Sequence, residues 1–215
     1  MVAGDLYSFW RSSASYRVRI ALNLKSLEYQ TIPIHFRKDG GQHRTPDYLR
    51  RNPQGLVPVW AEGDWSLNQS LAIIEYLDEL YPDVPLLPSD RRQKAEVRAL
   101  AQEIACDIHP LDNLRVLGYL KQNLHLDQDS IDAWYRHWVE VGFEALESRL
   151  VHTAGICSYG DAVGLVDCCL MPQIYNARRF NVDMSPYPTI RCVEDALVDL
   201  QAFIDASPEA QPDAE

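Results

Sequence analysis

The sequence lacks long apolar runs and basic tracts. No stretch of 18 consecutive apolar residues occurs among its 215, and no basic segment leads into an apolar one near residue 1. We therefore expect neither a membrane span nor a signal peptide. Lys and Arg gather no further than pairs, and the formal net charge is −11. A nucleic-acid partner is not expected, because binding phosphates requires a basic face.

Cysteines are few and lack metal-binding spacing. None of the five forms a C-x-x-C pair or a Cys/His pattern of the kind that holds zinc. The sequence therefore predicts no metal site, and it indicates reduced, buried thiols in a cytoplasmic protein. Internal repeats and low-complexity tracts are also missing. With 47% apolar residues, the chain is long enough for one large or two small globular domains.

A strand, a turn and a helix open the chain. Residues 6–9 form a short apolar run, and apolar residues recur at helical spacing across residues 13–24. Three serines, Ser12, Ser13 and Ser15, stand where this helical stretch begins. Hydroxyls at a helix start either cap free backbone amides, the role expected of Ser15, or help to bind an anion. The spacing alone leaves both alternatives open.

Further strands and helices follow up to residue 80. A β-branched run at 29–34, with Pro33 near its end, predicts an edge strand. A polar loop with a short helical turn at 47–50 leads to the Val57-Pro58 bond, where a tight turn is needed and a cis peptide is possible. Residues 59–67 predict a hairpin and 71–80 a helix.

The second half of the chain predicts helices. Three prolines within residues 82–90 indicate a linker, so the expected division is a first domain at 1–81 and an all-helical domain at 91–215. We expect Ser89 to cap a helix ending near 104, Pro110 to restart one, and Asp129-Ser130 to cap a helix over 131–150. Two further helices are expected at 165–180 and 190–204, with a frayed end from Pro208 onward.

Three motifs in order resemble one family. They are Ser-Ser-Ala-Ser-Tyr-Arg-Val-Arg-Ile-Ala-Leu at 12–22, Asn-Pro…Val-Pro at 52–58, and Gln-Ser-Leu-Ala-Ile-Ile-Glu-Tyr-Leu at 69–77. Together they resemble the zeta-class glutathione transferases, a family that includes maleylacetoacetate isomerases and bacterial maleylpyruvate isomerases. The resemblance covers nearly the whole chain. It implies an α/β thioredoxin-like domain followed by an all-α domain, glutathione as cofactor, and a homodimer.

Glutathione has groups that need different partners. The helix that begins at Ser70, with the amide of Gln69, suits its γ-glutamyl carboxylate, although plain capping is the alternative. Its peptide can pair with the backbone of Val57, for which the family implies a cis proline; an ordinary turn proline is the alternative. Its thiol needs a hydroxyl donor, the role assigned to Ser12 with Ser13 beside it.

The resemblance adds three less specific glutathione ligands. These are His43, whose family position faces the glycyl end of glutathione, and His109 and Asn113. A loop histidine and a satisfied histidine at a helix kink are the ordinary interpretations of His43 and His109. The sequence also departs from the family, which has cysteine where this chain has Ala14. At Gly164 it lacks the usual hydroxyl cap of a later helix.

The family reaction defines the small-molecule substrate. A thiolate adds to a cis double bond, the resulting single bond rotates, and elimination restores a trans double bond. The carboxylates of the substrate need cations, for which the candidates are Arg11, Arg115 and Arg179, although a lone arginine is more often a plain surface residue. The expected activity is conversion of maleylacetoacetate to fumarylacetoacetate in tyrosine and phenylalanine catabolism. Alternatives are maleylpyruvate of the gentisate pathway as substrate, broader transferase or α-haloacid dehalogenase activity, and glutathione binding without turnover.

Overall fold

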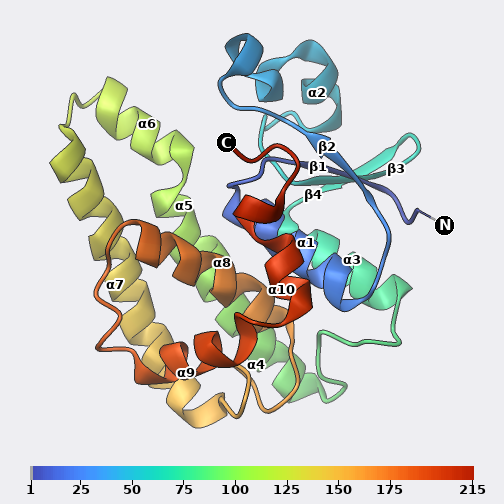
Figure 1. Ribbon diagram of the computed structural model, residues 1–215, viewed down its shortest axis with the longest axis vertical. Coiled ribbons are helices and arrows are strands. Elements are labelled where there is room, and N and C mark those ends of the chain that lie inside the picture. Colours follow the sequence, from blue (N-terminus) through green and yellow to red (C-terminus); the bar gives the residue numbers. More distant parts are fainter. Residues whose placement is uncertain (1) are drawn as a thin grey trace. The chain divides into compact units, whose positions relative to one another are not determined.

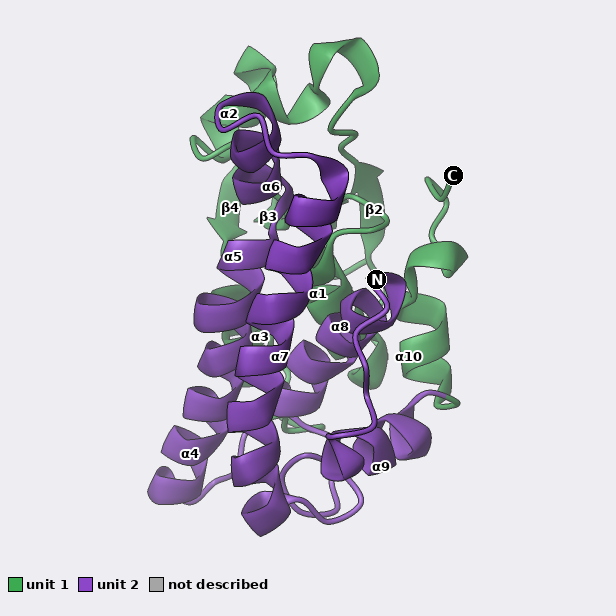
Figure 2. Ribbon diagram, turned by 90° about the vertical axis from the view of Figure 1, so that its left-hand side faces the viewer, with its two compact units in different colours: residues 1–86, 199–215 green, residues 87–198 purple. Residues whose placement is uncertain are grey.

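The computed structural model describes residues 2–215, which pack into two compact units (Figure 2). Unit 1 comprises Met1–Leu86 and Asp199–Glu215, and unit 2 comprises Leu87–Val198. The division at residue 86 falls inside the predicted linker. Residues 199–215, however, belong to unit 1, although they follow the helices of unit 2 in the sequence. The division into functional domains stays a prediction.

Unit 1 is built on a four-stranded mixed sheet. Its strands are β1 (Asp5–Ser8), β2 (Gln30–Pro33), β3 (Val59–Glu62) and β4 (Trp65–Asn68), in the order β2-β1-β3-β4. β1 runs parallel to β2 and antiparallel to β3, which in turn pairs antiparallel with β4. β2 therefore lies at an edge, where the missing amide of Pro33 leaves no ladder bond unmade. This order confirms the predicted β-α-β and β-β-α connections.

Helices complete unit 1. They are α1 (Ser13–Leu24), α2 (Pro46–Arg51), α3 (Ser70–Leu80) and α10 (Gln201–Ala206), with short 3₁₀ turns at Lys38–Gly40, Gln42–Arg44 and Pro208–Ala210. α1 packs against both α3 and α10, and Figure 1 shows α10 alongside α1. The residues of α1 from 15 to 22 are all buried, so this helix has no solvent-exposed face over that stretch.

The α1 side chain of Arg19 joins segments that lie far apart in the sequence. Its guanidinium is fully buried and donates to the carbonyl of Ala206 (2.8 Å), the hydroxyl of Ser8 (3.1 Å) and the carbonyl of Trp10 (2.9 Å). Burial lowers the pKa of Arg19 to about 10, which leaves it charged at neutral pH. These bonds explain why residues 199–215 belong to unit 1.

Two expectations for the last part of the chain were wrong. The predicted single helix at 190–204 is two helices, α9 (Pro188–Leu197) and α10, because Leu200 takes an extended conformation between them. The segment after Pro208 was expected to fray. Instead, the side chains of Asp213 and Glu215 hydrogen-bond to residues of unit 1.

Unit 2 is helical throughout its regular structure. It contains α4 (Arg91–Gln102), a π-helical segment (Glu103–Ile108), α5 (His109–Asp112), α6 (Leu114–Gln122), α7 (Gln128–Thr153), α8 (Leu165–Arg179) and α9. The π segment directly precedes α5, which contains Pro110, the residue expected to restart a helix. It lies against α7, since a Cβ on Gly142 would stand 2.3 Å from the Ile108 side chain.

Helix caps in unit 2 differ from the predictions. Asp90, not Ser89, caps α4 by accepting from the amides of Arg92 and Gln93 (both 3.0 Å). Asp127, not Asp129-Ser130, caps α7. In both cases the cap is the aspartate directly before the first helical residue, which is Arg91 in α4 and Gln128 in α7. Gly164 is the N-cap of α8, as predicted. The carboxylate of Asp167 accepts from the backbone amide of Gly164 (2.8 Å).

The cysteines are all free, as expected, but only three are buried. Cys106 and Cys192 are exposed, contrary to the expectation for them, while Cys157, Cys168 and Cys169 are buried. Among residues 2–215, none of the helices combines the length and apolar character that crossing a membrane requires.

Replacing Arg19 by lysine is expected to destabilise the fold. A lysine cannot reach all three acceptors in the same geometry, so at least one buried oxygen loses its donor at a cost of about 1–3 kcal/mol. Urea unfolding of Arg19→Lys measures the change in the free energy of unfolding. Arg50→Lys is the matched control, because the Arg50 side chain is 71% exposed. Equal stability of the two variants would contradict the role given to Arg19.

Candidate functional site

Ser12 caps helix α1. Its side-chain oxygen accepts from the backbone amide of Ser15 (3.2 Å), and its own amide donates to the carbonyl of Phe9 (2.9 Å). The expectation that Ser15 caps was wrong: Ser15 lies inside the helix, fully buried, and its hydroxyl has no hydrogen-bond partner. Because capping uses a lone pair of Ser12, its hydroxyl proton is still available to a ligand. Capping and ligand binding are thus compatible.

The neighbours of Ser12 differ in exposure. Ser13, the first residue of α1, is buried. Arg11, just before the cap, is half-buried, and its guanidinium lies 5.0 Å from the centre of the Trp10 ring. A helix N-terminus carries a partial positive charge. The start of α1 therefore offers a hydroxyl, free amides and a nearby cation.

The loop before β3 presents its backbone. The Val57-Pro58 peptide is cis, as the sequence suggested. The carbonyl of Leu56 accepts from the Tyr48 hydroxyl (2.6 Å) and the Asn52 amide (2.8 Å), which fixes the loop. Within residues 2–215, neither the amide nor the carbonyl of Val57 makes a backbone hydrogen bond. Both can therefore pair with a bound peptide.

The start of α3 lies against this loop. Gln69 precedes the helix with a positive φ of 72°, and its side chain donates to Gln54 (3.2 Å). Asn68 donates to Asn52 (3.1 Å), a second link to the same loop. No side chain caps α3 within the described chain, so the amides of its first turn are open to an anion. Val57, Gln69 and Ser70 are thus brought together.

Behind Ser70 lies a residue that the sequence analysis missed. Ser70 is buried, and its hydroxyl accepts from the guanidinium of Arg17 (3.3 Å), which is itself buried in α1. A buried cation beside the start of α3 adds to the attraction for a carboxylate. The signal was available, since Arg17 and Arg19 stand in an otherwise apolar stretch of helix.

His43 lies at the far side of the same loop. A Cβ on Gly55, whose φ is +62°, would come within 3.1 Å of the His43 carbonyl. Its ring packs on Phe36, with centroids 4.4 Å apart, and its Nε2 accepts from Arg44 (3.2 Å). Burial, and then the charge of Arg44, lower the pKa of His43, so the ring is neutral at pH 7. Its Nδ1 is buried without a partner and can bind a ligand atom.

The unit 2 candidates sit at helix ends. His109 begins α5 directly after the π segment, a kind of irregularity often found at functional sites. Asn113 caps α6, accepting from the amides of Arg115 and Val116 (both 3.1 Å). Its side-chain NH₂ still has two hydrogens to donate. Arg115 is exposed in the first turn of α6.

Arg179 ends α8 and has an aromatic setting. Its guanidinium lies 4.8 Å from the centre of the Phe180 ring and is hydrogen-bonded to the hydroxyl of Tyr135. The ring of Tyr135 stacks on Phe180 at 3.5 Å. Tyr135 is buried, and burial raises its pKa, so it stays a neutral phenol. The sequence analysis missed Tyr135 as a support for Arg179.

Asp112 is a second feature that sequence reasoning missed. It is only 5% exposed, and neither carboxylate oxygen has a hydrogen-bond partner. Burial raises the pKa of Asp112 to about 8, so it is mostly protonated at neutral pH. It lies between the candidates His109 and Asn113 in sequence and close enough to Tyr135 to raise that hydroxyl's pKa further.

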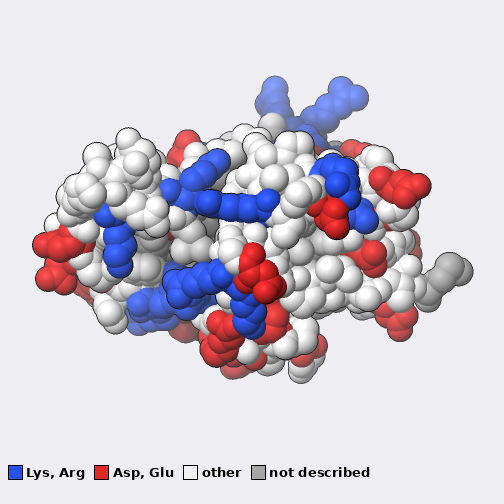
Figure 3. Space-filling view, turned by 90° about the horizontal axis from the view of Figure 1, so that it is seen from above, with Lys and Arg blue, Asp and Glu red and all other residues white. Residues whose placement is uncertain are grey.

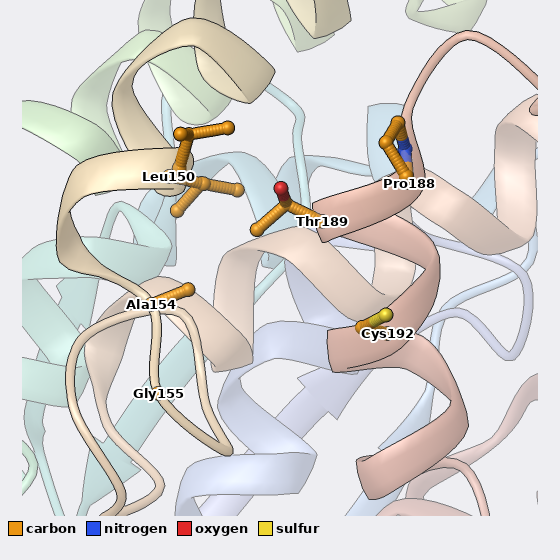
Figure 4. Close-up of a pocket in the computed structure, with 7 residues that line it drawn as sticks. Leu150, Ala154, Gly155, Pro188, Thr189 and Cys192 are labelled. Atoms are coloured by element: carbon orange, nitrogen blue, oxygen red, sulfur yellow. The ribbon is translucent and has the colours of Figure 1, made fainter.

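Charged side chains on one face, and one pocket in unit 2, are further features of the described chain. On the face drawn in Figure 3, Lys and Arg side chains stand in separate groups among Asp and Glu. A pocket of about 250 Å³ lies between the end of α7 and α9. Leu150, Ala154, Pro188 and Thr189 line it beside Cys192 (Figure 4), and its lining includes none of the predicted site residues and no charged group. Within residues 2–215, no group of His, Cys, Asp and Glu side chains could hold a metal ion.

The donors of unit 1 fit a tripeptide with an anionic end and a thiol. An uncapped helix start with a buried guanidinium behind it suits a carboxylate, the unpaired backbone of Val57 suits a peptide, and the Ser12 hydroxyl suits a sulfur. This agrees with the chemistry of glutathione.

Comparison with known proteins identifies relatives over the full chain. Residues 6–91 match the family model described as glutathione S-transferase, N-terminal domain. The chain is 51% identical over 214 residues to a probable maleylacetoacetate isomerase of Vibrio cholerae, covering 100% of both proteins.

Two solved structures are similar throughout. One is the holo structure of a maleylpyruvate isomerase, a bacterial glutathione S-transferase of the zeta class, with a TM-score of 0.94 and 46% identity over 98% of this chain and all of that one. The other is a maleylacetoacetate isomerase of Methylobacterium extorquens with bound malonate and glutathione, with a TM-score of 0.93 and 40% identity over 98% and 99% of the chains.

Asp112 is expected to make stability depend on pH. The folded protein keeps this proton up to about pH 8, whereas the unfolded chain loses it near 3.8. The contribution of protonated Asp112 to the free energy of unfolding is therefore complete below about pH 4. It is lost as the pH rises to about 8, at up to about 1.4 kcal/mol per pH unit.

Asp112→Asn is expected to remove most of this slope. Urea unfolding at a series of pH values measures it, with the exposed Asp107→Asn as a matched control in the same unit. An unchanged slope in Asp112→Asn would show that Asp112 ionises normally.

Proposed function

Because this chain belongs to the zeta class of the glutathione transferases, we propose that it is a glutathione-dependent cis-trans isomerase that converts maleylacetoacetate to fumarylacetoacetate. The observation that carries the proposal is the Ser12 hydroxyl, placed as the cap of α1 with its proton free to donate to a sulfur. Sequence similarity over the whole chain to a probable maleylacetoacetate isomerase supports the choice of substrate.

Residues of unit 1 bind glutathione. The first turn of α3, with Ser70 and Gln69, holds the γ-glutamyl carboxylate, and Arg17 adds positive charge behind Ser70. The amide and carbonyl of Val57 pair with the peptide. His43 contacts the glycyl end, where its buried Nδ1 supplies a polar atom. His109 and Asn113 of unit 2 add polar contacts to the cofactor.

The Ser12 hydroxyl keeps the thiol ionised, with Ser13 beside it. A free thiol titrates near 8.5, so only a few per cent is ionised at pH 7. A hydroxyl donor together with the positive end of α1 favours the thiolate over the thiol. Ala14 leaves no protein thiol at this point of the helix, so the reacting sulfur comes from the cofactor alone.

Arginines hold the diacid and meet the charge that develops on it. Bound glutathione supplies a thiolate that adds to the cis double bond, which rotates as a single bond before elimination restores it as trans. Arg11, Arg115 and Arg179 bind the substrate's carboxylates and stabilise negative charge on its carbonyl oxygen. Tyr135 and Phe180 keep the guanidinium of Arg179 oriented.

Maleylpyruvate is the second candidate substrate. The similarity to a maleylpyruvate isomerase of the zeta class, at a TM-score of 0.94, favours it. The two substrates differ by one methylene before the terminal carboxylate, which a few side chains can discriminate. Comparing kcat/KM for maleylpyruvate with that for maleylacetone, an analogue of maleylacetoacetate, decides between them. Retention on immobilised glutathione with no turnover of either would favour a binding protein.

The proposal includes a homodimer in the cytoplasm. The family supports the dimer, and five cysteines that form no disulfide support a reducing compartment. Sedimentation equilibrium measures the mass in solution.

Ser12→Ala is expected to raise the pKa of the bound thiol by about one unit, which reduces the ratio of thiolate to thiol at neutral pH about tenfold. The ultraviolet absorbance of the thiolate, followed with pH in the glutathione complex, measures this shift. Ser15→Ala is the matched control, because the Ser15 hydroxyl is buried and unpartnered. Ser12→Thr keeps a hydroxyl and should restore the wild-type pKa. A thiol pKa in Ser12→Ala equal to that of the wild-type complex would remove Ser12 from this role.

Arg179→Met is expected to reduce kcat/KM for the diacid by about 10- to 100-fold, because a charge-assisted pair to a carboxylate is lost. The dissociation constant of glutathione should stay unchanged in calorimetry. Arg178→Met is the control, since Arg178 is the neighbour of Arg179 in α8 but pairs with Glu194 of α9. Equal kcat/KM values for both variants would exclude Arg179 from substrate binding.

A further inference from the structure

The last residues of the chain contact two loops that carry candidate glutathione ligands. We propose that residues 211–215 hold these loops in place, so that Asp213 positions Ser12 and Glu215 positions His43. Both are positioning residues, since they act through the loops and not on the reacting atoms. The inference rests on the function proposed above.

Asp213 fixes the loop that leads to Ser12. Its carboxylate accepts from the backbone amide of Trp10 (3.0 Å), while the carbonyl of the same residue accepts from Arg19 (2.9 Å). The amide and the carbonyl of Trp10 are therefore both hydrogen-bonded, each to a different side chain. Ser12 lies two residues further on, and its amide donates to Phe9 (2.9 Å), which closes the turn. The position of the Ser12 hydroxyl thus depends on this turn.

Glu215 fixes the start of the loop that ends at His43. Its carboxylate lies 2.9 Å from Nζ of Lys38 and 3.2 Å from Nε2 of His35. The Nδ1 of His35 accepts from the amides of residues 37 and 38, so Nε2 carries the proton and donates to Glu215. His35 also exchanges bonds with Gln42, next to His43: its amide donates to the Gln42 side chain (2.8 Å), and its carbonyl accepts from the Gln42 amide (2.9 Å).

The segment itself is anchored. Gln211 is buried, and its side-chain NH₂ donates to the backbone carbonyls of Asp205 and Ser207 (both 2.9 Å) at the end of α10. α10 is in turn fixed to α1, where the Tyr16 hydroxyl donates to Phe203 (3.3 Å) and Asn23 donates to Ala202 (3.0 Å). Figure 1 shows the chain end returning past α1 toward the strands. A continuous set of contacts thus leads from α1 to both loops.

The two contacts have different expected effects. A hydroxyl that stabilises a thiolate must stand at hydrogen-bond distance from it, and small misplacements are costly. Loosening the Trp10 turn should therefore raise the pKa of the bound thiol. Loosening the loop of His43 should weaken glutathione binding and leave the thiol pKa unchanged, because that loop contacts the glycyl end.

The experiment compares Asp213→Ala, Asp213→Asn and the control Asp205→Ala in the full-length protein. Asp205 is an exposed residue in α10, and its carboxylate accepts from Gln201 of the same helix (2.7 Å). Thiolate absorbance against pH gives the pKa of bound glutathione, and calorimetry gives its dissociation constant. Asp213→Ala should raise the pKa of the bound thiol by about 0.5–1 unit, which lowers the ratio of thiolate to thiol at a given pH about threefold to tenfold. Asn, which keeps an acceptor for the Trp10 amide, should restore it.

Glu215→Gln is the second variant, and it should raise the dissociation constant without moving the thiol pKa. A thiol pKa in Asp213→Ala equal to that in Asp205→Ala, with the wild-type protein showing a depressed value, would overturn the inference and leave the proposed function intact. A wild-type protein that binds no glutathione would overturn both. If Asp213→Ala does not fold, the other two variants decide. A pKa of the bound thiol that differs from the wild-type value in either Asp213→Asn or Glu215→Gln would contradict the assignment.

Discussion

The buried guanidinium of Arg19 is the constraint on which unit 1 depends. It is a charge without a carboxylate in contact, satisfied by two carbonyls and a hydroxyl from β1, the turn before α1, and α10. Burying a charge is costly unless every donor finds an acceptor, so these three segments must be in place together. The position of the α1 N-terminus, and of Ser12 with it, follows from this requirement.

An acidic protein can bind an anionic cofactor because the attraction is local. With a net charge of −11, the overall field opposes an anion. The start of α3 offers unpaired amides, and the Arg17 guanidinium lies buried behind Ser70. Charges in such low-dielectric surroundings act strongly over a few ångströms, whereas surface carboxylates are screened by solvent and salt. The same reasoning applies to Arg179, which is oriented by Tyr135 and Phe180.

Sequence reasoning predicted what local patterns determine. The succession of strands and helices along residues 5–80, the limits of α1, the cis peptide at Pro58 and the helix start at Ser70 follow from apolar periodicity, proline chemistry and the family motifs. It was wrong where neighbouring polar residues compete for one role, as with Ser89 and Asp90, or Ser12 and Ser15. Each pair offers adequate caps, and only the packed helix selects one.

It also missed what long-range packing creates. Nothing local marks residues 199–215 as part of unit 1, because Ala206 is 187 positions from Arg19, to which it is hydrogen-bonded, and Asp213 is 203 positions from its partner Trp10. The buried acid Asp112 owes its pKa to burial, which spacing does not reveal. The glutathione and substrate ligands themselves stay predictions that the geometry of each unit supports.

The central claim is that glutathione is bound as its thiolate at the start of α1. The most direct test is calorimetry of glutathione binding to the wild-type protein at pH 7, in buffers of different ionisation enthalpy, which counts the protons released. The account predicts release of close to one proton for each glutathione bound, since the free thiol is mostly protonated at that pH. Binding with no proton release would contradict it.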